Sequence, residues 1–87
     1  MSKVYDKAIA KWGKTAQLIM FIEEASELTK ELTKDLRNQG DKKAIIEEIA
    51  DVEIMLEQLK IIYKCSSPLE EIKKIKLARL EERIDNG

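Results

Sequence analysis

Apolar residues recur every three or four positions along most of the chain, which is the period of an α-helix with one buried face. One long stripe runs through 14–37 and consists of Leu18, Phe21, Ile22, Ala25, Leu28, Leu32 and Leu36. A second runs through 42–64 and consists of Ile45, Ile49, Val52, Leu56, Leu59 and Tyr63. The strict alternation of apolar and polar residues that marks a β-strand is absent, so the pattern predicts an all-α protein.

Short polar breaks divide this pattern into four predicted helices. Gly13 ends a short first helix, because glycine tolerates the left-handed conformation that follows many helix C-termini. The segment 38–40 forms a turn, and Asp41 is a candidate N-cap for the third helix. The segment 67–70 reads as a capping box that opens a fourth helix, which runs to about Asp85. Short connections favour antiparallel neighbours, so we expect a bundle of three long helices plus the short first one.

Composition narrows the class of protein. The chain has 87 residues, so we expect a single domain over 1–87. With 16 Lys and Arg against 17 Asp and Glu, the net charge is -1, which gives no basic field for a nucleic acid polymer. The longest apolar run, 18–22, is far shorter than the roughly 20 residues of a membrane span, and 1–3 opens no signal peptide. We therefore expect a cytoplasmic protein without a membrane partner.

The same composition limits the chemistry and predicts assembly. Cys65 is the single cysteine and there is no histidine, which excludes an intrachain disulfide and a Cys/His metal site. A chain of this length buries only a modest core. Apolar residues nevertheless lie on additional sides of the long helices, at Ile19, Ile46, Ile54 and Ile61. We therefore expect a homodimer or homotetramer that completes the bundle, with 14–37 and 42–64 at the interface.

Two pairs of acids interrupt the apolar stripes. Glu24 and Glu27 lie on the second predicted helix, Glu48 and Asp51 on the third, and each pair has i, i+3 spacing that presents both carboxylates on neighbouring positions. Two such charges 4 Å apart repel by about 4 kcal/mol at an effective dielectric near 20. A divalent cation removes that repulsion, so the pattern predicts a Mg²⁺ site, with Mn²⁺ as the substitute ion. The alternative is two solvated acidic faces in a chain of which 38% is charged.

The segments 23–28 and 47–52 resemble the MazG-like all-α nucleoside triphosphate pyrophosphohydrolases, which are defined by Glu-x-x-Glu followed by Glu-x-x-Asp. The similarity extends to Trp12-Gly13 and Gln17 and to the Lys76-x-x-Arg79 spacing. It implies a metal-dependent enzyme that cleaves (deoxy)nucleoside triphosphates between the α and β phosphates, releasing a monophosphate and pyrophosphate. It also implies that the Mg²⁺ ligands are Glu24, Glu27, Glu48 and Asp51.

In phosphoryl transfer the protein mainly positions the reactants and neutralises the charge of the phosphates, so no nucleophilic side chain is required. Mg²⁺ at this site would activate a water for attack on the α-phosphorus, and we expect Glu24 or Glu27 to accept its proton. Lys76 and Arg79 are predicted to point toward the bundle and to bind substrate phosphates, with solvated surface cations as the alternative. Further predicted substrate contacts are base stacking on Trp12, whose alternative role is a packing anchor, and a hydrogen bond from Gln17.

Two other functions use the same features. A non-enzymatic helical interaction or assembly protein would use the acidic helices as solvated or paired faces, although the breaks at 38–40 and 66–68 interrupt any long seven-residue repeat. A phosphoribosyl-ATP pyrophosphohydrolase would use the same carboxylates on a different substrate. Measured substrate preference separates that enzyme from a general triphosphate hydrolase.

Overall fold

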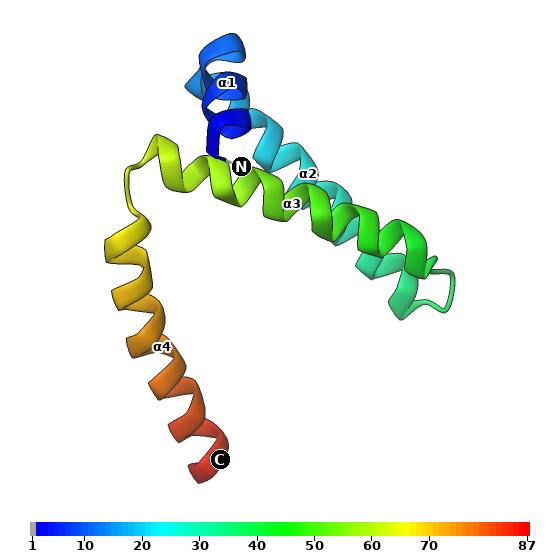
Figure 1. The fold of residues 1–87 in the computed structure, drawn as a ribbon. Helices are drawn as coiled ribbons and strands as arrows, with labels where there is room; N and C mark the ends of the chain where they lie inside the picture. The colour runs from blue at the N-terminus through cyan, green and yellow to red at the C-terminus, as the bar shows by residue number, and fades with distance from the viewer. Residues whose placement is uncertain (1) are drawn as a thin grey trace.

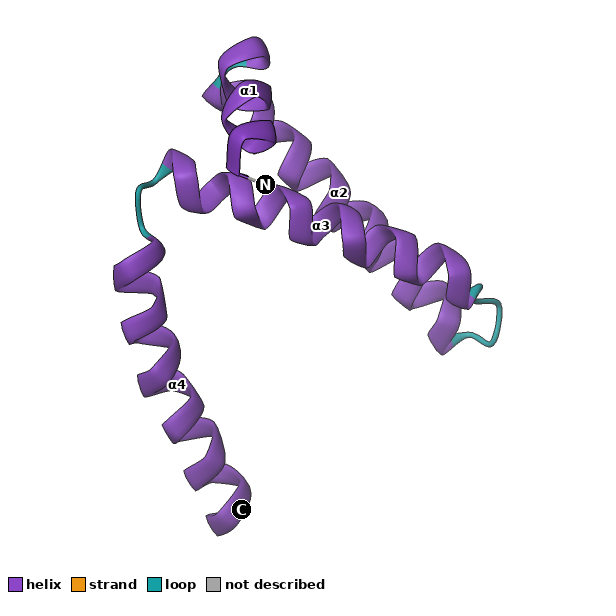
Figure 2. Ribbon diagram, viewed as in Figure 1, coloured by secondary structure: helices purple, strands orange, loops and turns teal. Residues whose placement is uncertain are grey.

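The computed structural model describes residues 2–87, which form four helices and, within that range, no β-strand (Figures 1 and 2). In chain order they are α1 (Ser2–Trp12), α2 (Lys14–Leu36), α3 (Lys42–Ile62) and α4 (Ser66–Asn86). The all-α prediction is confirmed, and each predicted helix is found within a few residues of its expected ends. None of these helices combines the length and the apolar composition that crossing a bilayer requires.

Gly13 forms the corner between α1 and α2. Its backbone has φ 90° and ψ 158°, a region that is essentially restricted to glycine. Its amide donates to the Ile9 carbonyl at 2.8 Å, and its own carbonyl accepts from the Gln17 amide at 3.2 Å. Gly13 therefore ends α1 as predicted, but in an extended conformation rather than a left-handed helical one, and α2 begins at the next residue.

The starts of α3 and α4 are capped differently. Asp41 is the N-cap of α3, and its Oδ1 accepts from the Lys43 amide at 3.0 Å, as predicted. The predicted capping box at 67–70 is wrong, because α4 begins at Ser66 and its N-cap, Cys65, makes no side-chain cap hydrogen bond. Pro68 thus lies in the first turn, where its missing N–H leaves no helical hydrogen bond unmade.

The helices α2 and α3 form an antiparallel hairpin, and α1 packs against both near its open end (Figure 1). The buried and half-buried side chains alternate at three- and four-residue intervals on the facing sides. On α2 they include Gln17, Phe21, Glu24, Leu28 and Glu31, and on α3 Ile45, Glu48, Val52, Met55 and Leu59. This spacing is typical of two helices packed along a seam, which we call the α2–α3 seam.

The core of the hairpin is small and partly polar. Among the described residues, Met55 is the one buried apolar side chain, with 5% of its surface exposed. Gln17 and Gln58 are buried beside it, and the Gln17 amide donates to Gln58 Oε1 at 2.6 Å. The Gln58 amide in turn lies 3.6 Å from Met55 Sδ. The Gln17 donor and the Gln58 acceptor are thereby paired, which lowers the cost of burying these polar groups.

The fourth helix departs from the predicted bundle. Beyond Leu69, which is half-buried, every residue of α4 is exposed, and the helix extends away from the hairpin (Figure 1). The turn before it contains Lys64 in a left-handed conformation with φ 51°. The predicted antiparallel packing of this helix on α3 is therefore absent within one chain, since the connection directs α4 outward.

Candidate metal centre

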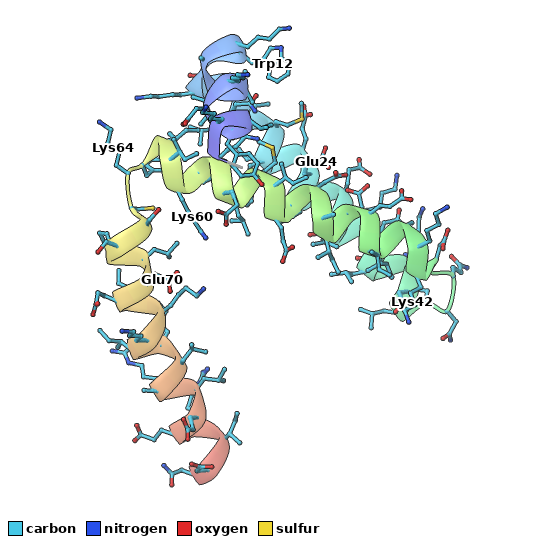
Figure 3. All side chains as sticks on the ribbon, in the orientation of Figure 1. Trp12, Glu24, Lys42, Lys60, Lys64 and Glu70 are labelled. Carbon is cyan, nitrogen blue, oxygen red and sulfur yellow. The ribbon has the colours of Figure 1, made fainter. Side chains whose placement is uncertain are left out.

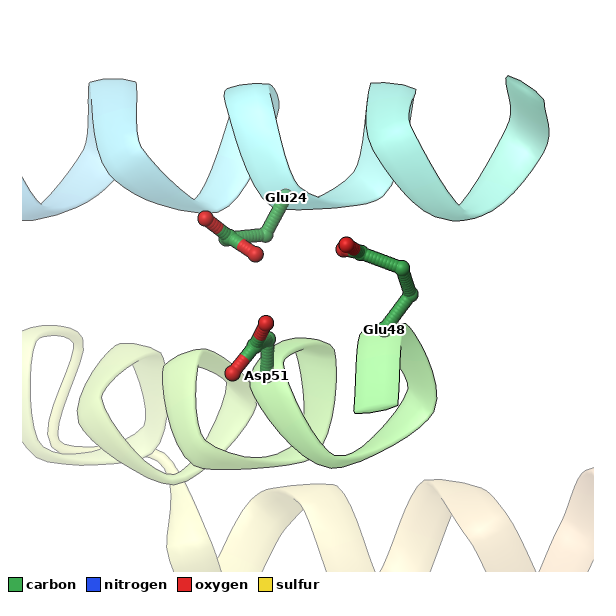
Figure 4. Close-up of side chains that lie close together, drawn as sticks. All are labelled: Glu24, Glu48 and Asp51. Carbon is green, nitrogen blue, oxygen red and sulfur yellow. The ribbon is translucent and has the colours of Figure 1, made fainter. Parts of the chain in front are cut away.

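Three carboxylates from two helices converge in the α2–α3 seam. Glu24 projects from α2, and Glu48 and Asp51 project from α3 toward it (Figure 4). Each residue contributes an oxygen that lies within 4.8 Å of the others. Glu24 and Glu48 are half-buried and Asp51 is exposed, so the group opens to solvent on one side.

The positions of the two glutamates follow from the helical repeat. Glu24 lies three residues after Phe21 and four before Leu28, and Glu48 lies between Ile45 and Val52 in the same manner. These are positions that a packed helix pair normally fills with apolar side chains. The seam therefore holds both glutamate carboxylates between the helices, and Asp51, whose side chain is one methylene group shorter, reaches the group from the flank.

The electrostatics of this group are unfavourable without a cation. Glu48 Oε2 is buried and has no hydrogen-bond partner. The pKa of Glu24 is raised above its ordinary value of 4.5, first by burial, then by the negative charge of Asp51 and that of Glu48. The ion pairs of the described chain, Lys34–Glu31, Lys60–Glu57 and Lys73–Glu70, involve none of the three acids.

This donor set suits a hard divalent cation. Mg²⁺ and Mn²⁺ prefer carboxylate and water oxygens, and Mg²⁺ is typically bound through one or two carboxylates together with waters. The unpartnered Glu48 Oε2 has lost its hydration without gaining a donor, and a cation would satisfy it. Glu24, Glu48 and Asp51 could therefore hold the ion, while the exposed side of Asp51 leaves room for water or a phosphate.

Glu27, the fourth predicted ligand, does not belong to this group. It is exposed on α2, whereas Glu24 faces the seam. Three residues on a helix correspond to about 300° of rotation, so the second acid of each pair is displaced by about 60° from the first. Glu27 and Asp51 therefore both lie on a flank of the seam and are exposed, and of these two it is Asp51 that has an oxygen within 4.8 Å of Glu24 and Glu48.

The two predicted base contacts have different surroundings. Trp12 is 59% exposed at the outer end of α1, with the Lys11 ammonium 5.5 Å from its ring centre (Figure 3). It is therefore no packing anchor within one chain. Gln17 is buried, and its side-chain amide donates a hydrogen bond to Gln58. Gln58 was not predicted from the sequence. The signal for Gln58 was its place three residues after Met55 on the buried side of α3.

Lys76 and Arg79 are exposed residues of α4, and α4 extends away from the helix pair that carries Glu24 (Figure 1). They line a shallow surface depression of about 530 Å³ together with Glu82, Arg83 and Asn86, all from the same helix. The prediction that they point toward the bundle is wrong for the single chain, because α4 does not fold back on α3. The chain by itself thus brings together three predicted ligands but not the phosphate-binding pair.

Comparison with known proteins adds no identification. No protein-family model, curated protein or solved structure matches this chain. The class that the fold and the site define is therefore an α-helical protein with a cluster of three carboxylates between two antiparallel helices.

Proposed function

We propose that this protein is a Mg²⁺-dependent nucleoside triphosphate pyrophosphohydrolase of the MazG-like type. The observation that carries the proposal is the convergence of Glu24, Glu48 and Asp51, with Glu48 Oε2 buried and unpartnered. Carboxylates at seam positions weaken helix packing unless something compensates their charge. A bound cation would compensate the charge of the three carboxylates and would also give them a catalytic role.

The acidic residues would have two roles in hydrolysis, metal binding and proton acceptance. Bound Mg²⁺, or Mn²⁺ in its place, would neutralise phosphate charge and acidify a bound water. Glu24, Glu48 and Asp51 would hold the ion, and Glu24 or the exposed Glu27 would accept a proton from the water that attacks the α-phosphorus.

Substrate recognition draws on residues outside the acid group. Lys76 and Arg79 bind phosphate oxygens, which the planar guanidinium of Arg79 can contact in pairs. The exposed indole of Trp12 is free to stack on a nucleobase. Gln17 faces the core, so its contribution is to position α2 through Gln58 unless the pair opens to admit a base.

We further propose that the active form is a cytoplasmic homodimer or homotetramer. Large apolar side chains remain exposed on both helices of the hairpin, among them Ile19 at 52%, Ile46 at 55% and Ile54 at 45%. Burying such residues between copies supplies apolar contacts that one chain of this size lacks.

The direct test measures pyrophosphate release from a panel of ribo- and deoxyribonucleoside triphosphates, with Mg²⁺ and with excess chelator. We expect Mg²⁺-dependent release of monophosphate and pyrophosphate, and a loss of activity by orders of magnitude in Glu48→Gln. Glu47→Gln is the matched control, since Glu47 is the exposed neighbour outside the acid group. Diphosphate and orthophosphate as first products would exclude attack at the α-phosphorus.

The second candidate function is a helical interaction protein, which the exposed apolar residues and the unpacked α4 favour. In that case no triphosphate is hydrolysed and Mg²⁺ binds to neither the parent nor the variants. Adding phosphoribosyl-ATP to the substrate panel tests the third candidate, since strong preference for it would identify the related pyrophosphohydrolase.

A further inference from the structure

The glutamine pair at the open end of the hairpin is a polar feature that helix packing does not require. Gln17 lies in the first turn of α2 and Gln58 near the end of α3, and each is 5% exposed. Apolar residues occupy the seam between this pair and the acids, at Phe21, Val52 and Met55. Burying two amides costs free energy that apolar side chains of similar size would not. The pair is therefore a candidate for a role in ligand binding.

The hydrogen bond within the pair orients the Gln17 side chain. Gln17 Nε2 donates to Gln58 Oε1 at 2.6 Å. An amide is planar and has two donor hydrogens and one acceptor oxygen, so this bond leaves Gln17 with Oε1 and its second N–H for a ligand. The amide nitrogen of Gln58 lies 3.6 Å from Met55 Sδ, and a thioether sulfur is a weak acceptor.

The pair lies in the same seam as the candidate metal centre. Gln17 precedes Glu24 by seven residues, and Gln58 follows Asp51 by seven. At 1.5 Å per residue, both amides are displaced from the acids by about 10.5 Å along the helix axes. A nucleotide whose phosphates bind an ion at the acids extends its sugar and base away from them. A base directed toward α1 would therefore meet the amide pair.

The opposite direction along the seam suits a base less well. Seven residues beyond Glu24 the seam position is Glu31, whose carboxylate lies 3.3 Å from Lys34 Nζ. A carboxylate offers acceptors alone, whereas the edge of a base presents a donor beside an acceptor. The glutamine end of the seam is thus the end that matches a base.

The first helix covers this end of the seam. It packs against α2 and α3 near the open end of the hairpin, where Gln17 and Gln58 lie (Figure 1). Gly13 connects it to α2 through one backbone conformation with φ 90°. A displacement of α1 about this corner would expose the amides to a base without changing the acid group.

We propose that Gln17 contacts the nucleobase and that Gln58 is the positioning residue that determines which base is accepted. The inference rests on the proposed hydrolysis of nucleoside triphosphates. Held by Gln58, the Gln17 amide presents Oε1 to an exocyclic amino group and its second N–H to the ring nitrogen beside it, as cytosine and adenine require. Uracil, thymine and guanine present a carbonyl and a ring N–H in the opposite order, which an amide held in one orientation does not match. The preferred substrates are therefore cytidine and adenosine triphosphates.

The test compares CTP with UTP, which differ in this edge and not in size. We expect the parent to hydrolyse CTP with a kcat/KM about tenfold higher than that for UTP. Gln58→Met removes the acceptor that orients Gln17, so the ratio should fall to near one, mainly through KM. Gln58→Glu keeps an oxygen that accepts from Gln17 and should retain the preference. Leu59→Met is the matched control, since it changes the same seam without removing a polar group.

Binding without turnover gives a second readout. Calorimetry with α,β-methylene analogues of CTP and UTP, which are not cleaved between the α and β phosphates, should show the same change in the ratio of dissociation constants. A pair that serves helix packing alone would lower the melting temperature of Gln58→Met and leave both ratios as in the parent.

The outcomes distinguish this inference from the proposed function. Absence of triphosphate hydrolysis by the parent overturns both. Hydrolysis without preference for CTP over UTP, or a parent-like ratio in a Gln58→Met variant that is helical by circular dichroism, overturns the inference and leaves the proposed function standing. If Gln58→Met does not fold, Gln58→Glu decides, because loss of the preference in that variant overturns the positioning role and its retention supports it.

Discussion

Glu24 and Glu48 occupy seam positions where an aliphatic side chain would stabilise the hairpin. Their carboxylates lie close to each other and to Asp51, and none forms an ion pair within the described chain. Residues of this kind destabilise a small protein unless a ligand compensates them. Stability measurements with and without Mg²⁺ can therefore examine the metal assignment without an activity assay.

Replacing Glu48 by Gln removes one charge while keeping nearly the same volume and hydrogen-bonding reach. We expect the metal-free variant to be at least as stable as the metal-free parent, because like-charge repulsion falls. Millimolar Mg²⁺ should raise the melting temperature of the parent far more than that of the variant. Thermal melts with chelator and with Mg²⁺ measure both effects, and Glu47→Gln should respond as the parent does. Equal responses in parent and Glu48→Gln would remove Glu48 from the ligands.

The raised pKa of Glu24 predicts a pH dependence of stability in the metal-free protein. Between 4.5 and the raised pKa the folded chain holds a proton that the unfolded chain has lost, so stability falls as pH rises through this window. Glu24→Gln should abolish this contribution. The stability gained by the variant over the parent should be largest near pH 7 and shrink toward pH 4.5. Denaturant unfolding across that range measures it, with Glu23→Gln as the exposed control; a gain independent of pH would contradict it.

Among the elements, the corner between α1 and α2 depends on one backbone conformation. Gly13 has φ 90°, and a Cβ built there would meet no atom within 4 Å. A side chain is therefore excluded by backbone strain alone. This corner sets the direction in which α1 crosses the hairpin.

Gly13→Ala should lower the free energy of unfolding by about 1–3 kcal/mol, the usual cost of holding a residue with a side chain in this region. Lys14→Ala, one residue further on, is the control and should change stability by less than about 0.5 kcal/mol. Urea unfolding followed by circular dichroism gives both values. A neutral Gly13→Ala would mean that the corner can adopt another conformation.

At the level of the whole molecule, the candidate metal centre and the predicted phosphate-binding residues lie on different parts of the chain. Lys76 and Arg79 belong to α4, which extends away from the α2–α3 pair that carries the acids (Figure 1). Their contribution to one reaction therefore depends on where α4 lies in the assembled protein. Their removal should leave the acids and their ion unaffected.

Lys76→Ala and Arg79→Ala should each raise KM or lower kcat/KM for the nucleotide, because a phosphate contact is lost. The Mg²⁺-induced shift in melting temperature should survive in both variants. Lys74→Ala, on another side of α4, should retain the parent kinetics. Steady-state kinetics at saturating Mg²⁺ together with thermal melts measure the two properties. Unchanged kinetics in both variants would mean that Lys76 and Arg79 are solvated surface cations that do not bind the substrate.

Local features of the chain were predictable from residue order. The three- and four-residue repeats located the helices, Gly13 and Asp41 marked two of their ends, and the paired acids pointed to the carboxylate group. Each of these depends on interactions within a few residues, which spacing and residue type express directly. The capping box at 67–70 was wrong because the helix begins two residues earlier, at Ser66, without any side-chain cap.

Which residues meet across the seam depended on the tertiary structure. Helix rotation places Glu24 in the seam and Glu27 on an exposed flank of α2, and it pairs Gln17 with Gln58, forty-one residues away. The outward course of α4 likewise depends on a single turn around Lys64 rather than on the amphipathic pattern of the helix. A repeat specifies that a helix has an apolar face, but the partner of that face is chosen by packing between elements, and within this chain α4 beyond Leu69 remains exposed.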